Sequence, residues 1–97
     1  MNALGVPEKI HEMVRALLEN GWTFQVQHGI DSGGCRFLSI DARLTAGSEI
    51  LRMTWHTRAT DGKSYRWQSA LYGQRSLGSY AKSLAMVKGG PDRGIKR

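Results

Sequence analysis

The sequence predicts a two-layer α+β domain: an N-terminal helix, a four-stranded antiparallel meander and a C-terminal helix. Two observations carry this prediction. Apolar residues recur with helical spacing near both ends of the chain, and they alternate with polar residues through its middle. A four-stranded sheet with one apolar face needs a cover, and two amphipathic helices supply one.

The first helix is expected to begin at Pro7, because proline suits the first helical turn, and to end before Gly21. Glycine is common directly after a helix, where the backbone turns left-handed. The apolar residues between these points form a single stripe, made of Ile10, Met13, Val14, Leu17 and Leu18. Trp22 is expected to fold back onto the end of this stripe.

Two strands are predicted next from the alternation of apolar and polar residues. The first runs from Trp22 to near His28, and the second from about Arg36 to Leu44. The glycine-rich segment 29–34 connects them as a turn.

The third and fourth strands are predicted from the segment Glu49–Tyr72, in which two alternating runs flank an Asp61-Gly62 turn. The core face of this hairpin is expected to carry Leu51, Met53, Trp55, Tyr65, Trp67 and Leu71. Short loops between successive antiparallel strands favour a meander.

The second helix is expected to run from an N-cap at Ser76 to Lys88, with an apolar stripe made of Leu77, Tyr80, Ala81, Leu84 and Val87. Gly89-Gly90-Pro91 stops it. Residues 1–90 are therefore predicted to form one domain, and residues 91–97 a flexible basic tail.

The net charge of +6 increases toward the C-terminus: residues 1–30 carry −1, residues 31–72 carry +2 and residues 73–97 carry +5. Such a balance favours a polyanionic partner, with nucleic acid ahead of a membrane surface. No signal peptide or membrane span is evident, and the single cysteine excludes an internal disulfide bond. A cytoplasmic location is the simplest expectation.

The candidate nucleic-acid contacts are the basic residues on the solvent side of the predicted sheet, together with the tail: Arg43, Arg52, His56, Arg58, Arg66, Lys96 and Arg97. Guanidinium groups bind phosphates in a fork geometry. Gln68 and Tyr72 are expected to continue this face, and Tyr72 or Phe37 could stack a base. The alternative is a solvated face with cross-strand ion pairs, such as Asp41 with a neighbouring arginine.

The sequence gives little support for catalysis or metal binding. Strand alternation places His28 and His56 on opposite faces, which argues against a catalytic histidine pair. Cys35 has no second cysteine or histidine at zinc-binding spacing, and the glycine-rich turn lacks the phosphate-loop pattern. We therefore expect no enzymatic activity, no catalytic residue, no metal and no cofactor.

Two resemblances bear on function. The helix–strands–helix order with Gly21-Trp22 at the first helix end resembles small double-stranded-RNA-binding-like domains, including HicA-type toxins. The catalytic histidine of that family lies in a Gly-Ser-His motif, whereas the nearest match here is His28-Gly29, so the resemblance does not carry the activity. Trp55-His56-Thr57-Arg58 with Tyr65-Arg66 resembles small proteins of actinobacteria and their phages, which implies an accessory role in a phage or mobile element.

These observations predict a small basic nucleic-acid-binding module. The first alternative is a protein–protein module that engages or inhibits a host protein, or that forms a homodimer, and the second is an RNase-type toxin. A single exposed patch made of Ile30, Phe37, Ile50 and Tyr72 would favour the protein partner, because protein interfaces need an apolar centre.

Overall fold

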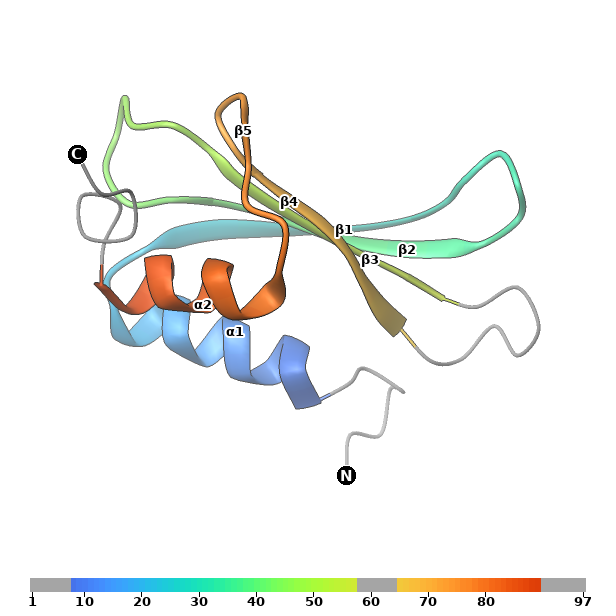
Figure 1. The fold of residues 1–97 in the computed structure, drawn as a ribbon, viewed down its shortest axis with the longest axis horizontal. Helices are drawn as coiled ribbons and strands as arrows, with labels where there is room; N and C mark the ends of the chain where they lie inside the picture. Colours follow the sequence, from blue (N-terminus) through green and yellow to red (C-terminus); the bar gives the residue numbers. More distant parts are fainter. Residues whose placement is uncertain (1–7, 58–64, 90–97) are drawn as a thin grey trace.

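A computed structural model describes residues 8–57 and 65–89 of the chain. The elements follow in the order α1 (Glu8–Glu19), β1 (Thr23–Ile30), β2 (Arg36–Arg43), β3 (Leu51–Thr57), β4 (Tyr65–Tyr72), β5 (Arg75–Ser76) and α2 (Tyr80–Gly89). The strands form one antiparallel sheet in the order β1-β2-β3-β4-β5, and both helices lie on the same face of it (Figure 1). The α+β class and the flanking helices agree with the prediction. The Asp61-Gly62 turn and the tail lie outside the described residues.

The sheet has a fifth strand that the sequence analysis did not predict. Tyr72 pairs with Arg75 across a two-residue turn, and Gly73 takes a φ of 61° at its first position. A positive φ at that position is the glycine signature of a type II′ hairpin. Gly73 therefore turns the chain from β4 into β5.

Both helices have defined ends, and one differs from the prediction. Gly21 has a φ of 81°, and the Trp22 N–H donates to the Leu17 carbonyl at 3.0 Å, which is a Schellman end for α1. The N-cap of α2 is Ser79, whose hydroxyl accepts the Lys82 N–H at 3.1 Å. The predicted cap, Ser76, lies in β5 instead.

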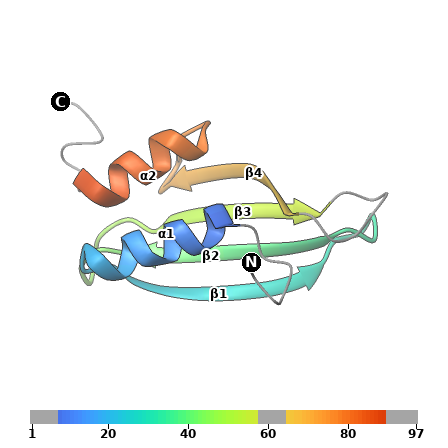
Figure 2. The same cartoon turned by 90° about the horizontal axis from the view of Figure 1, so that it is seen from below.

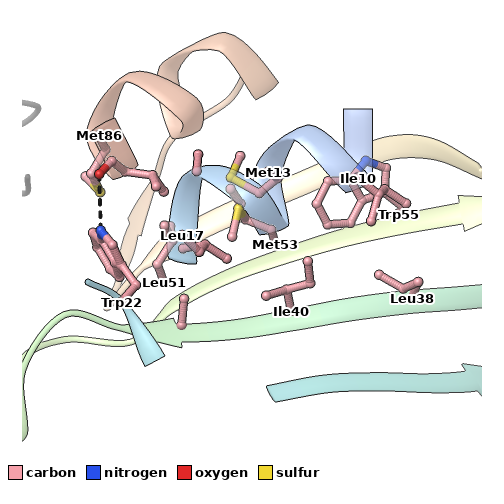
Figure 3. Close-up of a cluster of buried hydrophobic side chains, with 14 residues drawn as sticks. Ile10, Met13, Leu17, Trp22, Leu38, Ile40, Leu51, Met53, Trp55 and Met86 are labelled. Atoms are coloured by element: carbon pink, nitrogen blue, oxygen red, sulfur yellow. Dashed lines mark hydrogen bonds between the residues drawn. The ribbon is translucent and has the colours of Figure 1, made fainter. Parts of the chain in front are cut away.

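The core fills the space between the helices and the inner face of the sheet, by which we mean the face that the helices cover (Figure 3). Its buried residues are Ile10, Met13, Ala16, Leu17, Trp22, Leu38, Ile40, Ala42, Leu51, Met53, Trp55, Ala70, Met86 and Val87. Trp22 folds back as expected, and its indole N–H donates to the Val87 carbonyl at 3.1 Å. Trp55 meets Trp67 edge to face, with ring centroids 5.3 Å apart.

A β-bulge changes which residues of β4 face the core. Thr54 pairs with Ser69 and Trp55 with Trp67, so Gln68 is an extra residue in β4. One extra residue reverses the alternation beyond it. The prediction that Leu71 faces the core is therefore wrong, and so is the placement of Tyr72 on the solvent side. Leu71 is 42% exposed on the other face, whereas Tyr72 packs against the core.

The α1 helix is rotated about its axis relative to the predicted stripe. Ala16 is buried, whereas Leu18 at the other flank is 64% exposed. The reason is α2, which lies beside α1 (Figure 2). Tyr80 of α2 bonds to Glu12 of α1, and Ala16 lies one turn from Glu12 on the same flank. Neither α1 nor α2 is long and apolar enough to cross a membrane, and the described residues hold no helix that is.

Candidate nucleic-acid interface

The outer face of the sheet, opposite the helices, has no element over it in the described part of the chain (Figure 1). Strand pairing arranges its side chains in three cross-strand rows. The aromatic row contains Gly29, Phe37, His56 and Arg66. The hydroxyl row contains Gln27, Ser39, Thr54 and Ser69. The ion-pair row contains Gln25, Asp41, Arg52 and Leu71.

Arg52 forms a two-pronged ion pair with Asp41 on the neighbouring strand. Its Nε donates to Asp41 Oδ1 at 2.8 Å and its Nη2 to Oδ2 at 3.0 Å. The hydrogen bond and the charge of Asp41 raise the pKa of the Arg52 guanidinium. This contact is the cross-strand pair that the sequence offered as an alternative to phosphate binding. The Arg52 side chain nevertheless remains 59% exposed, and its Nη1 edge is not used by Asp41.

A shallow depression of about 400 Å³ lies beside this ion pair. Arg43 and Arg52 line it from β2 and β3, and the exposed apolar side chains of Ile50 and Leu71 contribute its other walls. Glu49 also lines the depression. The depression therefore combines two guanidinium groups with a small apolar surface.

The aromatic row at the other end of the sheet supports a half-buried histidine. The ring centroids of Phe37 and His56 lie 6.1 Å apart. Arg66 of β4 is the direct cross-strand neighbour of His56 of β3. His56 Nδ1 lies 3.3 Å from Asp31 Oδ2. Asp31 is itself fixed, because its Oδ1 accepts the backbone N–H groups of Gly33 and Cys35 at 2.9 Å. His56 is thus held by its own strand, the Phe37 ring and the β1–β2 turn.

Gly29 leaves room for this arrangement. A Cβ atom at Gly29 would lie 2.5 Å from Cζ of Phe37, which is closer than real Cβ contacts come. The Phe37 ring therefore lies over the glycine backbone of the neighbouring strand. Glycine at this position of β1 allows the ring to approach the sheet.

The structure brings three of the predicted contact residues onto the described outer face together with His56: Arg43, Arg52 and Arg66. Arg58, Lys96 and Arg97 lie outside the described residues. The prediction that His28 and His56 lie on opposite faces is confirmed by the register, because His28 pairs with the buried Leu38. Among residues 8–57 and 65–89, no three His, Cys, Asp or Glu side chains lie close enough to hold a metal ion.

The single exposed patch that would have favoured a protein partner, made of Ile30, Phe37, Ile50 and Tyr72, does not form. Ile50 lines the outer-face depression, but Tyr72 and Ile30 lie on the inner face, and Phe37 is half-buried over Gly29. Ile50 lies beside Leu71 in the depression instead. The sequence does not predict this neighbour, because the alternation of residues does not reveal the bulge at Gln68.

Comparison with family models, with curated proteins and with solved structures found no match to this chain.

Proposed function

We propose that the protein binds nucleic acid through the outer face of its sheet. One observation carries the proposal: no element of the described residues covers this face, and it presents Arg43, Arg52 and Arg66, while the one carboxylate on its described strand positions, Asp41, is bound by Arg52. Guanidinium groups on a flat surface bind phosphates by charge and by directed hydrogen bonds. The net charge of +6 adds long-range attraction.

The rows suggest how a strand of nucleic acid would lie. The hydroxyl row lies between the aromatic row and the ion-pair row. These two outer rows are therefore four residues apart along each β-strand, a distance of roughly 13 Å. Arg66 at one end and Arg43 with Arg52 at the other would hold separated phosphates. The Phe37–His56 pair offers an edge for base stacking. Between the rows, the exposed Ser69 and the half-buried Thr54 offer hydroxyls for hydrogen bonds, whereas Ser39 is buried. Lys96 and Arg97 remain predicted contributors.

A salt titration tests the proposal. Binding to labelled single-stranded and duplex DNA and RNA is measured by fluorescence anisotropy at several salt concentrations. Each phosphate contact contributes roughly 0.7 units to the slope of log K against log salt for single strands, and roughly 0.9 for duplex DNA. The double variant Arg43→Ala, Arg66→Ala should therefore flatten the slope by about 1.4 units on a single strand.

The matched control is Lys82→Ala, Lys88→Ala, which removes the same charge from exposed positions of α2 in the helical layer. It should leave the slope nearly unchanged. Equal slopes for the two double variants would mean that the attraction is a property of net charge alone. The absence of salt-dependent binding by the wild-type protein would refute the proposal.

The second candidate function is recognition of a protein partner by the same face. The depression between Arg43 and Arg52 favours it, because Ile50 and Leu71 supply the apolar surface that a protein partner needs. An acidic peptide with one apolar anchor fits this chemistry. An affinity that falls in Leu71→Ser while the salt slope stays that of the wild type would favour this alternative over phosphate recognition.

A further inference from the structure

The two edges of the sheet differ in a way that the proposed function does not use. The β5 edge is only two residues long and carries Arg75. The β1 edge is eight residues long, and its sequence, Thr-Phe-Gln-Val-Gln-His-Gly-Ile, contains no proline, no lysine and no acidic residue. Natural proteins protect long edge strands with charges, prolines or bulges, because an open strand edge pairs readily with another strand. β1 pairs with β2 without a bulge.

The free edge of β1 presents a regular row of backbone groups. The Asp31 N–H donates to the Cys35 carbonyl at 2.9 Å, which makes this a hydrogen-bonded pair of the β1–β2 ladder. Because such pairs alternate, the odd-numbered residues of β1 bond to β2. The N–H and C=O groups of Phe24, Val26, His28 and Ile30 therefore point away from the sheet, and no described strand lies beside them.

Apolar side chains accompany this edge on the inner face. Val26 is 43% exposed and Ile30 is 69% exposed, because most of β1 extends clear of both helices (Figure 2). Leu18, also exposed, lies on the flank of α1 that faces away from α2. Unpaired backbone groups and uncovered apolar side chains thus occur together along one strand.

We propose that β1 is a dimerisation edge and that its occupant is a second copy of the chain, with the two β1 strands antiparallel about a two-fold axis at Gln27. In this register all four outward-facing residues find partners. Phe24 pairs with the partner's Ile30, and Val26 pairs with the partner's His28. The two sheets then join into one, and the uncharged strands bring no like charges together despite the net charge of +6.

Charge complementarity at the ends of the strand favours this register. Arg43 pairs with Thr23 on the outer face at one end of β1, and Asp31 follows Ile30 at the other end. Antiparallel pairing about Gln27 places Thr23 opposite the partner's Asp31. Arg43 then lies two strand spacings, about 10 Å, from that aspartate, which a long arginine side chain can largely span. The same contact occurs twice in the dimer.

The mass of the full chain tests the proposal in the absence of nucleic acid, so its outcome is independent of the proposed function. Light scattering coupled to gel filtration, at up to about 0.5 mM protein, should show the mass rising from 10.8 kDa toward twice that value. Gln27→Lys places two ammonium groups opposite each other at the axis and should weaken dimerisation at least about tenfold. Gln68→Lys makes the same charge change at an exposed position of β4 and should leave dimerisation unchanged.

Cross-linking tests the register. In a Cys35→Ser background, Gln27→Cys places two thiols directly opposite each other, with Cα atoms about 4.5 Å apart, within disulfide range. Gln25→Cys places its two thiols roughly 13 Å apart along the strands, beyond that range. Mild oxidation should therefore cross-link the first variant and not the second. A wild-type chain that stays monomeric, a Gln27→Lys dimer as tight as wild type, or equal cross-linking of the two cysteine variants would each overturn the proposal.

Discussion

β1 and β3 carry the same alternating pattern, but they end up in different environments. The inward side chains of β3, Leu51, Met53 and Trp55, are almost completely buried. On the same face of β1, Phe24 is half-buried and Val26 is exposed. The difference comes from neighbours, because β3 lies between two long strands under the helices, whereas β1 has only β2 beside it among the described strands (Figure 2). Alternation identifies the apolar side of a strand but does not say whether another element covers it.

The largest expected effect follows from this contrast. Trp55→Ala and Leu17→Ala should each lower the free energy of unfolding by about 2–5 kcal/mol, because both remove large side chains from the closed part of the core. Val26→Ala on the open strand should cost less than about 1 kcal/mol, since its side chain is already partly hydrated. Urea denaturation measures all three. Similar losses for Val26→Ala and Trp55→Ala would mean that β1 is covered in solution, as the proposed dimer would cover it at high protein concentration.

That concentration dependence sharpens the test. At low protein concentration, where a dimer dissociates, Val26→Ala should be nearly neutral. At high concentration its cost should rise, because Val26 would then be buried beside the partner's His28. The cost of Leu17→Ala should not depend on concentration, because Leu17 is completely buried within one chain.

A smaller effect is expected where β1 meets the aromatic row of the outer face. Gly29→Ala places a Cβ against the Phe37 ring and should destabilise the fold by roughly 1–3 kcal/mol, because the ring must move away from the sheet. Gly33→Ala in the adjacent turn is the control, since its Cβ would make only an ordinary contact with Asp31. The double variant Gly29→Ala, Phe37→Ala should lose less than the sum of the two single variants. Strict additivity would contradict the packing of Phe37 over Gly29.

Sequence patterns predicted much of the fold because they report local chemistry. Helical spacing, the Gly21 terminus and the alternation in β2 and β3 depend on neighbouring residues, and the structure confirms them. The reversal at Gln68 and the rotation of α1 toward Ala16 depend on tertiary packing, which no short pattern encodes.

For the candidate site, the sequence predicted the face of the sheet on which its residues lie. Alternation placed Arg43, Arg52, His56 and Arg66 on one face, and the strand register confirms this. Alternation did not show whether Asp41 would form an ion pair with Arg52, because an ion pair depends on strand register and side-chain rotamer. The depression lined by Ile50 and Leu71 was not predicted, since it exists only after the bulge turns Leu71 outward.

A still smaller effect is expected at the hydrogen bonds that join α2 to α1. The Tyr80 hydroxyl lies 2.6 Å from the Lys9 carbonyl and 2.7 Å from Glu12 Oε1, and shares its one hydrogen between them. Tyr80→Phe should therefore cost about 1 kcal/mol by urea denaturation at pH 7. The mutation should leave the Trp67–Tyr80 ring contact in place.

The pH dependence of that effect has a defined sign. Burial, followed by the hydrogen bond to Glu12, raises the pKa of Tyr80. The stabilisation from the neutral hydroxyl is thus fully present below the ordinary tyrosine value of about 10 and is lost as the pH rises toward the folded-state pKa. The stability difference between wild type and Tyr80→Phe should shrink above pH ~10. A difference that grew with pH would contradict the assigned hydrogen bond.

The smallest stability effect, and the one most informative about the outer face, is expected from Asp41→Asn. The exposed Arg52–Asp41 pair should contribute only about 0.2–1 kcal/mol to folding. If the face binds phosphates, however, Asp41 competes with them for Arg52. Removing its charge should then strengthen binding to a single-stranded oligonucleotide and steepen the salt slope by roughly 0.7 units.

Glu19→Gln makes the same charge change at an exposed position of α1 and should leave the slope nearly unchanged. Equal effects of the two variants would mean that net charge alone sets the affinity. Weaker binding by Asp41→Asn would mean that the carboxylate orients Arg52 for its ligand instead of competing with it.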